Sequence, residues 1–122
     1  MIRVVRLGSP RARGEGLRLG TVRRPPRGVK KKDYARLDYY DLWLPELSPS
    51  APLVAKVQRN WTGFAKAYRR EMARPAAHRL LELLAQLSRH ADFSVGCYCE
   101  EERRCHRSVL RELLKELGAR IA

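Results

Sequence analysis

The chain has 122 residues, 44% of them hydrophobic, and a formal net charge of +13. This length fits one domain that buries a core without disulfides, and the hydrophobic fraction excludes a chain disordered throughout. No apolar run is long enough for a membrane span and the first residues lack the apolar core of a secretion signal, so we expect a cytoplasmic protein without a membrane partner.

The positive charge is concentrated near the N-terminus. Residues 1–36 hold twelve Lys or Arg against two acidic residues, whereas the other 86 hold fourteen basic and eleven acidic residues. A basic surface attracts phosphates by releasing counterions, so a nucleotide or a nucleic acid is a candidate partner. The alternative is a basic surface that only keeps the protein in solution.

The first half of the chain predicts two short strands and a basic loop. Residues 2–7 and 17–22 are each predicted to form a strand, because their apolar residues stand in a short run or alternate with polar or small residues. Glycine and proline end the first of them. Residues 23–32 contain Pro25 and Pro26, which excludes a helix or a central strand there. Residues 34–43 are aromatic and acidic, and we expect them to be extended or irregular.

The second half predicts four helices and one strand. The helices cover about residues 51–58, 61–73, 76–89 and 104–117, with Ser50 and Asn60 as caps and Gly118 as a stop. Residues 93–98 form the strand. The helix over 76–89 is expected to bury its leucines, which are Leu80, Leu81, Leu83, Leu84 and Leu87.

This order of elements predicts one α/β domain over residues 1–122, with a small, largely parallel sheet flanked by helices. The strand over 93–98 is apolar or small on both faces, so it belongs at the centre of the sheet.

Residues 97–107 contain the largest group of reactive and charged side chains, at the junction between a predicted strand and a predicted helix. This segment contains all three cysteines, His106, Arg103 and Arg107. A helix N-terminus favours an anion and disfavours cations, so arginines gathered there indicate a bound phosphate or carboxylate. The alternative is that the three glutamates at 100–102 neutralise them locally.

A thiol at a helix N-terminus near arginines has its thiolate favoured. Cys105 is therefore the candidate nucleophile, with Cys97 as the alternative and His106 as an acid or base. The competing interpretation is a small buried cysteine that only packs under the helix.

Two other patterns cover the same segment. Cys97 and Arg103 have the C-x5-R spacing of phosphate-binding loops, but glutamates fill the loop where small residues are needed. Cys97, Cys99, Cys105 and His106 are of ligand types that suit zinc or iron. Adjacent Cys105 and His106 rarely share one metal and there is no C-x2-C pair, so we assign no metal ligand and no cofactor.

Several of these motifs resemble a known family. The run from Val95 to Glu100, the Cys105-His106-Arg107-Ser108 run, and the Arg24-Pro25-Pro26-Arg27-Gly28 run are similar to the bacterial domain of unknown function 488. The resemblance implies a compact α/β fold without an established activity. It also implies that Arg27, Cys97, Cys105, His106 and Arg107 belong to one site.

The leading hypothesis is a protein that binds a phosphate-bearing or anionic ligand at this site. Arg24, Arg27, Arg103 and Arg107 are the candidate ligand-binding residues, while Cys105 and His106 carry any chemistry. The alternatives are a non-catalytic module that binds nucleic acid through the basic N-terminal surface, and a thiol redox or metal protein. Whether the chain is an enzyme, and its oligomeric state, stay open.

Overall fold

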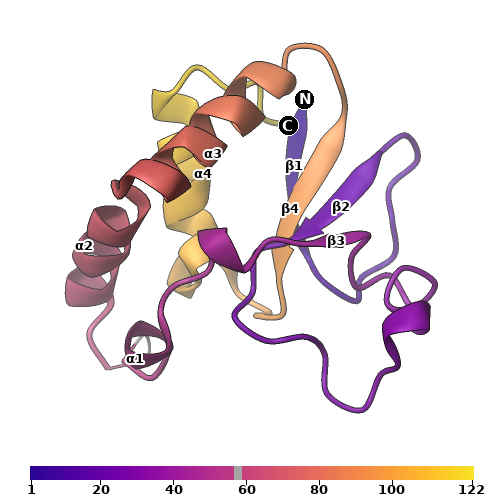
Figure 1. Cartoon of the computed structure of the whole chain (residues 1–122), viewed down its shortest axis with the longest axis horizontal. Coiled ribbons are helices and arrows are strands. Elements are labelled where there is room, and N and C mark those ends of the chain that lie inside the picture. Colours follow the sequence, from indigo (N-terminus) through magenta and orange to yellow (C-terminus); the bar gives the residue numbers. More distant parts are fainter. Residues whose placement is uncertain (57–58) are drawn as a thin grey trace.

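A parallel sheet runs through the centre of the structure, a computed structural model that describes residues 1–56 and 59–122. Its strands are β1 (Ile2–Arg6), β2 (Leu17–Gly20), β3 (Leu42–Trp43) and β4 (Phe93–Cys97). They lie in the order β1-β4-β2-β3, and all adjacent pairs are parallel (Figure 1). The predicted α/β class and parallel sheet are confirmed.

Strand β4 is the central strand, as its apolar composition predicted. All five of its residues are buried, and Phe93 lies in register with Ile2 of β1 and with Leu17 of β2. Because the strands run parallel, β1, β2 and β4 end at the same edge of the sheet, at Arg6, Gly20 and Cys97 respectively.

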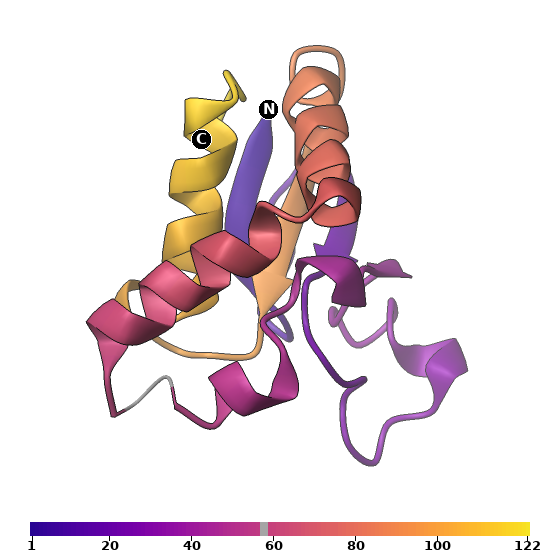
Figure 2. The same ribbon diagram turned by 60° about the vertical axis from the view of Figure 1, so that its left-hand side comes forward.

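The helices are α1 (Ala51–Val54), α2 (Trp61–Met72), α3 (Pro75–Leu87) and α4 (His106–Glu116). The last three lie together on one side of the sheet (Figures 1 and 2). Asn60 caps α2, since its side chain accepts the N–H of Gly63 at 3.0 Å. Gly118, at φ 85°, ends α4 in the left-handed region, as expected of a C-terminal glycine. Within the described residues, no helix has the length and apolarity needed to cross a bilayer.

The main core lies between these helices and the sheet. Phe64, Tyr68 and Met72 of α2 face it, and the Tyr68 hydroxyl donates to the carbonyl of Leu47 at 2.6 Å. The prediction for α3 was wrong at Leu83 and Leu87, which are 59% and 43% exposed. Only one stripe of a helix can face a sheet, and Ala77, Leu81, Leu84 and Ala85 occupy it.

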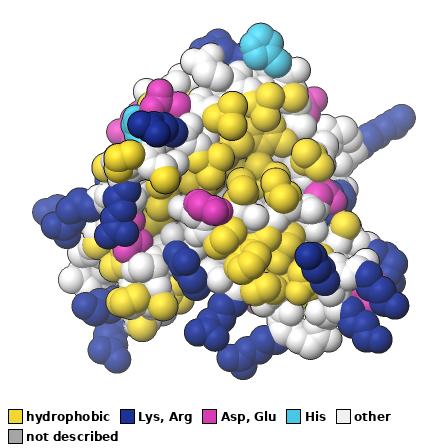
Figure 3. Space-filling model, in the orientation of Figure 1, with side chains coloured by type: hydrophobic (Ala, Val, Ile, Leu, Met, Phe, Trp, Pro, Cys, Tyr) yellow, Lys and Arg dark blue, Asp and Glu magenta, His cyan; other side chains and the backbone are white. Residues whose placement is uncertain are grey.

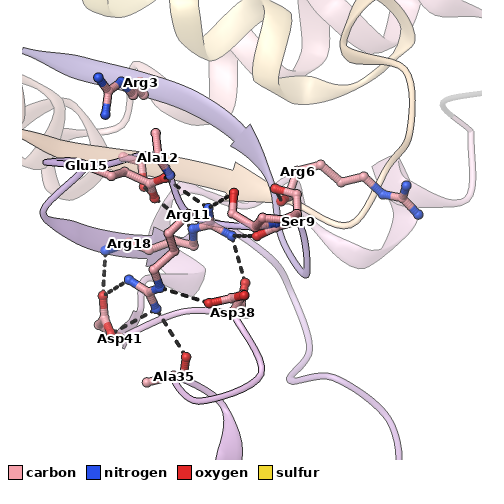
Figure 4. A network of polar contacts seen from close by, with 12 residues as sticks. Arg3, Arg6, Ser9, Arg11, Ala12, Glu15, Arg18, Ala35, Asp38 and Asp41 are labelled. Carbon is pink, nitrogen blue, oxygen red and sulfur yellow. Dashed lines mark hydrogen bonds and ion pairs between the residues drawn. The ribbon is translucent and has the colours of Figure 1, made fainter.

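The other side of the sheet is covered by loops that an ion pair holds in place (Figure 4). The Arg18 guanidinium, fully buried, donates to both Glu15 carboxylate oxygens at 2.8 and 3.0 Å, and to the carbonyls of Ser9 and Asp38 at 2.8 Å. Asp41 accepts the backbone N–H of Arg18 and also pairs with Arg11 at 2.8 Å. This network ties residues 8–16 and 35–41 to β2.

The remaining differences from expectation are at element boundaries. The last helix begins at His106 rather than near residue 104, because Glu102–Arg104 form a separate 3₁₀ turn. The helix expected over 51–58 spans Ala51–Val54, and residues 57–58 lie outside the described part of the chain. Two further 3₁₀ turns, Lys31–Asp33 and Pro45–Leu47, flank β3.

Candidate functional site

A cleft of about 660 Å³ opens at the edge where the parallel strands end. Open α/β sheets place their ligands at this edge, and the volume is that of a small-molecule site. Much of the wall is apolar and comes from Val22, Pro25, Pro26, Pro49, Phe64 and Tyr98. Among the described residues, the charged side chains that line the cleft are all arginines: Arg23, Arg24 and Arg27.

The three cysteine sulfurs converge on the floor of this cleft. The Sγ atoms of Cys97, Cys99 and Cys105 all lie within 4.8 Å of one another, and those of Cys97 and Cys99 are 3.8 Å apart. Cys97 is the last residue of β4, and Cys105 is the N-cap of α4. Cys97 and Cys105 are buried whereas Cys99 is exposed, and no disulfide joins them.

Arg107 lies beneath this sulfur cluster and is 3% exposed. Its Nε donates to the Cys105 Sγ at 3.4 Å and its Nη2 donates to the carbonyl of Cys99 at 2.6 Å. Among the ion pairs of the described residues, none involves Arg107. A buried cation requires a compensating negative charge, and the sulfur that its Nε contacts is a group that can carry one.

His106 is fixed by the end of β2. Its Nε2 lies 2.7 Å from the Thr21 carbonyl and 3.1 Å from the Thr21 hydroxyl, which itself donates to Gly96. A carbonyl only accepts hydrogen bonds, so Nε2 carries a proton. The Nδ1 of the same ring lies 3.8 Å from the Cys105 Sγ.

The electrostatics single out Cys105 among the three thiols. Hydrogen bonds from Cys97 and Cys99, followed by the contact with His106, hold the pKa of Cys105 below its ordinary value despite burial. The hydrogen bonds of Cys97 with Cys105 and then with Cys99 raise the pKa of Cys97. The hydrogen bond with Cys105 likewise raises the pKa of Cys99. Of the three thiols, Cys105 is thus the one whose thiolate form the cluster favours.

The structure places two of the four predicted arginines on the wall of the cleft and two outside it. Arg24 and Arg27 line the cleft together with Cys97, Cys99, Cys105 and His106, and both arginines are exposed to solvent. Arg103 is exposed and is not among the lining residues, while Arg107 is buried, contacts the sulfur of Cys105 and does not line the cleft.

The glutamates of the loop do not pair with the neighbouring Arg103. Glu102 forms an ion pair with Arg111 at 2.7 Å, and Glu100 lies 3.6 Å from Arg6 of β1. The loop is thus held by contacts to α4 and to the end of β1.

Thr21 is a site residue that the sequence reasoning missed. It directly follows β2, and a polar residue just after a strand next to the central one is the signal that would have found it. The wall supplied by Ala51, Val54 and Ala55 was also missed, because it depends on how α1 packs beside the loop.

The three cysteine sulfurs are also grouped closely enough to hold a metal ion. Our assignment of no metal ligand considered His106 as the fourth member of the set, adjacent to Cys105. The structure groups the sulfurs without that ring, whose Nε2 is directed at Thr21.

Comparison with known proteins yields a family and no individual relative. Neither the curated proteins nor the solved structures contain a match to the chain. The profile of the family DUF488-N3a, described as the active DUF488-N3 subclade, matches residues 2–118. The resemblance noted in the sequence is thereby confirmed, and the chain belongs to this DUF488 family.

Proposed function

We propose that the cleft binds a small phosphate-bearing ligand of the nucleotide type, with its anionic group between the arginines of the basic loop and the sulfur cluster. The observation that carries the proposal is that Arg24 and Arg27 line the same cleft as Cys97, Cys99, Cys105 and His106. Residues about 70 positions apart in the chain thus face one cavity at the ligand-binding edge of the sheet.

The character of the walls supports this class of ligand. With three arginines and no acidic side chain among its described lining residues, the cleft attracts anions, and its low-dielectric walls strengthen that field. The proline and aromatic surfaces, which include Pro25 and Tyr98, offer a face on which a base or another flat ring packs.

Chemistry on the bound ligand is assigned to Cys105, whose sulfur meets the anionic end. Cys105 lies at the N-terminus of α4, receives a hydrogen bond from Arg107, and has His106 beside it. Cys97 is the alternative because its sulfur also lines the cleft. Arg107 acts through Cys105 and does not line the cleft itself. The family description as an active subclade is in keeping with a chemically competent site.

The test is calorimetric titration with inorganic phosphate and a nucleoside monophosphate. Reversing Arg24 and Arg27 to Glu is expected to weaken binding at least about tenfold, which corresponds to about 1.4 kcal/mol. Arg79→Glu is the matched control, because Arg79 is an exposed arginine on α3 outside the cleft. Equal binding by the cleft variant and the control would contradict the proposal.

A second candidate function is nucleic-acid association through the basic loop. Lys30, Lys31 and Lys32 are exposed, and Figure 3 shows Lys and Arg side chains along the lower edge of the molecule. Reversing these lysines to Glu is expected to reduce oligonucleotide affinity and the steepness of its salt dependence. The Arg24 and Arg27 reversals would weaken nucleotide binding more than they weaken oligonucleotide binding if the two surfaces act separately.

A further inference from the structure

We propose that the sulfur atoms of Cys97, Cys99 and Cys105 bind one thiophilic divalent cation of the zinc type, whose fourth coordination position opens into the cleft. This proposal rests on the proposed function for the ligand that meets the cation, and it replaces the nucleophilic role of Cys105 with that of a metal ligand. It accounts for all three cysteines, whereas a nucleophilic role requires only one of them.

The spacing of the sulfurs is the first argument. A zinc ion with Zn–S bonds of about 2.3 Å and tetrahedral angles separates its sulfur ligands by about 3.8 Å. The Sγ atoms of Cys97 and Cys99 are 3.8 Å apart, and the Cys105 sulfur completes a set within 4.8 Å. The three ligands are thus already grouped at nearly the separation that the cation imposes.

The buried Arg107 is the second, independent argument. Its guanidinium is 3% exposed, contacts the Cys105 sulfur, and forms no ion pair among the described residues. A divalent cation with three thiolates carries one net negative charge, which the single positive charge of Arg107 neutralises. Buried charges are tolerated when they are paired. The positive charge of Arg107 and the net negative charge of the metal centre would compensate each other.

The surrounding contacts hold the ligands in position. Cys97 is fixed as the last residue of the central strand and Cys105 as the N-cap of α4, while Arg107 holds the loop through the carbonyl of Cys99 at 2.6 Å. Such partners orient metal ligands and tune their affinity. His106 is not a ligand in this arrangement, since its Nε2 donates to Thr21.

The open position follows from where the cluster lies. All three cysteines line the cleft, so a cation among them faces the cavity in which we place the ligand. Metal sites with three protein ligands and one open position are those that bind water or substrate. An anionic oxygen of the ligand is the group that would occupy it, and each thiol that binds the metal releases its proton to water.

The experiment is a Co²⁺ titration of the full-length chain, stripped of metal and kept reduced. The expected result is one Co²⁺ per chain, with sulfur-to-cobalt charge-transfer absorption that Zn²⁺ abolishes. Cys99→Ser, which changes an exposed thiol, is expected to weaken binding at least about 100-fold, since even a residue behind a ligand contributes about 10–100-fold. Glu101→Gln is the matched control, because Glu101 is exposed in the loop between two proposed ligands and its replacement is expected to leave the absorption unchanged.

Arg107 gives a second readout. Arg107→Leu is expected to weaken Co²⁺ binding about 10–100-fold and to shift the charge-transfer energy, whereas Arg107→Lys keeps the charge and recovers part of the affinity. Circular dichroism establishes that each variant is folded. Absence of the charge-transfer band in the wild type, or full intensity in folded Cys99→Ser, would overturn the proposal.

Adding inorganic phosphate or a nucleoside monophosphate to the Co²⁺ protein tests the open position. A change in the visible Co²⁺ spectrum supports it, and an unchanged spectrum at saturating ligand overturns that part. Ligand binding without any metal binding overturns this inference and leaves the proposed function standing. Metal binding without any ligand binding overturns the proposed function and leaves the three-cysteine metal site standing.

Discussion

The buried pair of Glu15 and Arg18 gives a stability prediction that the structure makes quantitative. Burial by itself raises the pKa of Glu15, but hydrogen bonds from Arg18, then Ser94 and the backbone of Ala12, more than compensate and bring it to about 2, against an ordinary 4.5. Because a tenfold change in proton affinity corresponds to about 1.4 kcal/mol, the charged carboxylate stabilises the fold by about 3 kcal/mol. Glu15→Gln keeps the shape, removes that charge, and leaves Arg18 buried without a partner.

The assay is urea unfolding across a pH series. Since the pKa of Glu15 is depressed in the folded state, its stabilisation is complete above pH 4.5 and is lost as the pH falls toward 2. The wild type is therefore expected to exceed Glu15→Gln by about 3 kcal/mol at pH 7, and the gap should close near pH 2. Glu82→Gln, at an exposed carboxylate on α3, should change stability little at any pH. Equal stability of wild type and Glu15→Gln at pH 7, or a gap that persists unchanged at pH 2, would refute this reasoning.

Three other predictions follow from the packing, each measured by thermal or urea unfolding. Leu83→Gln should change the free energy of unfolding by less than about 0.5 kcal/mol, because Leu83 is 59% exposed. Leu81→Ala, at a buried position of the same helix, should lower it by about 2–5 kcal/mol. Similar decreases for the two variants would contradict the orientation of α3. Asn60→Ala should cost about 1 kcal/mol by removing the cap of α2, and Asn60→Asp should retain most of it. Tyr68→Phe should cost about 1–3 kcal/mol because the carbonyl of Leu47 loses its buried donor, and a neutral result would count against that hydrogen bond.

The fold was accessible from the sequence where local signals were strong. Apolar residues on both faces identified β4 as the central strand, and the cap at Asn60 and the stop at Gly118 located helix ends. The leucines of α3 show the limit. The leucines of this helix outnumber the positions on the one stripe that faces the sheet, so the expectation that all of them are buried was wrong for Leu83 and Leu87.

The candidate site was predictable only in part. A strand-to-helix junction brings Cys97 and Cys105 near each other in any α/β fold, and the structure shows their sulfurs grouped with that of Cys99. The position of Arg107 depends on a hydrogen bond to a loop carbonyl, and that of His106 depends on Thr21, which directly follows β2. Such contacts between distant segments have no local signature. The Glu15–Arg18 pair is local in sequence, but its burial depends on the loops that supply the carbonyls of Ser9 and Asp38.

The place of β4 in the sheet has a consequence for how the protein is made. β1 and β2 both pair with β4 and not with each other, so in a chain emerging from the ribosome β1 has no strand partner, and β2 has only the two-residue β3, until residues 93–97 have been synthesised. Pairings between such distant segments form slowly, and unpaired edges are prone to aggregate. Folding of the sheet is therefore expected to follow translation, and nascent chains that stop before β4 should depend on chaperones to stay dispersed.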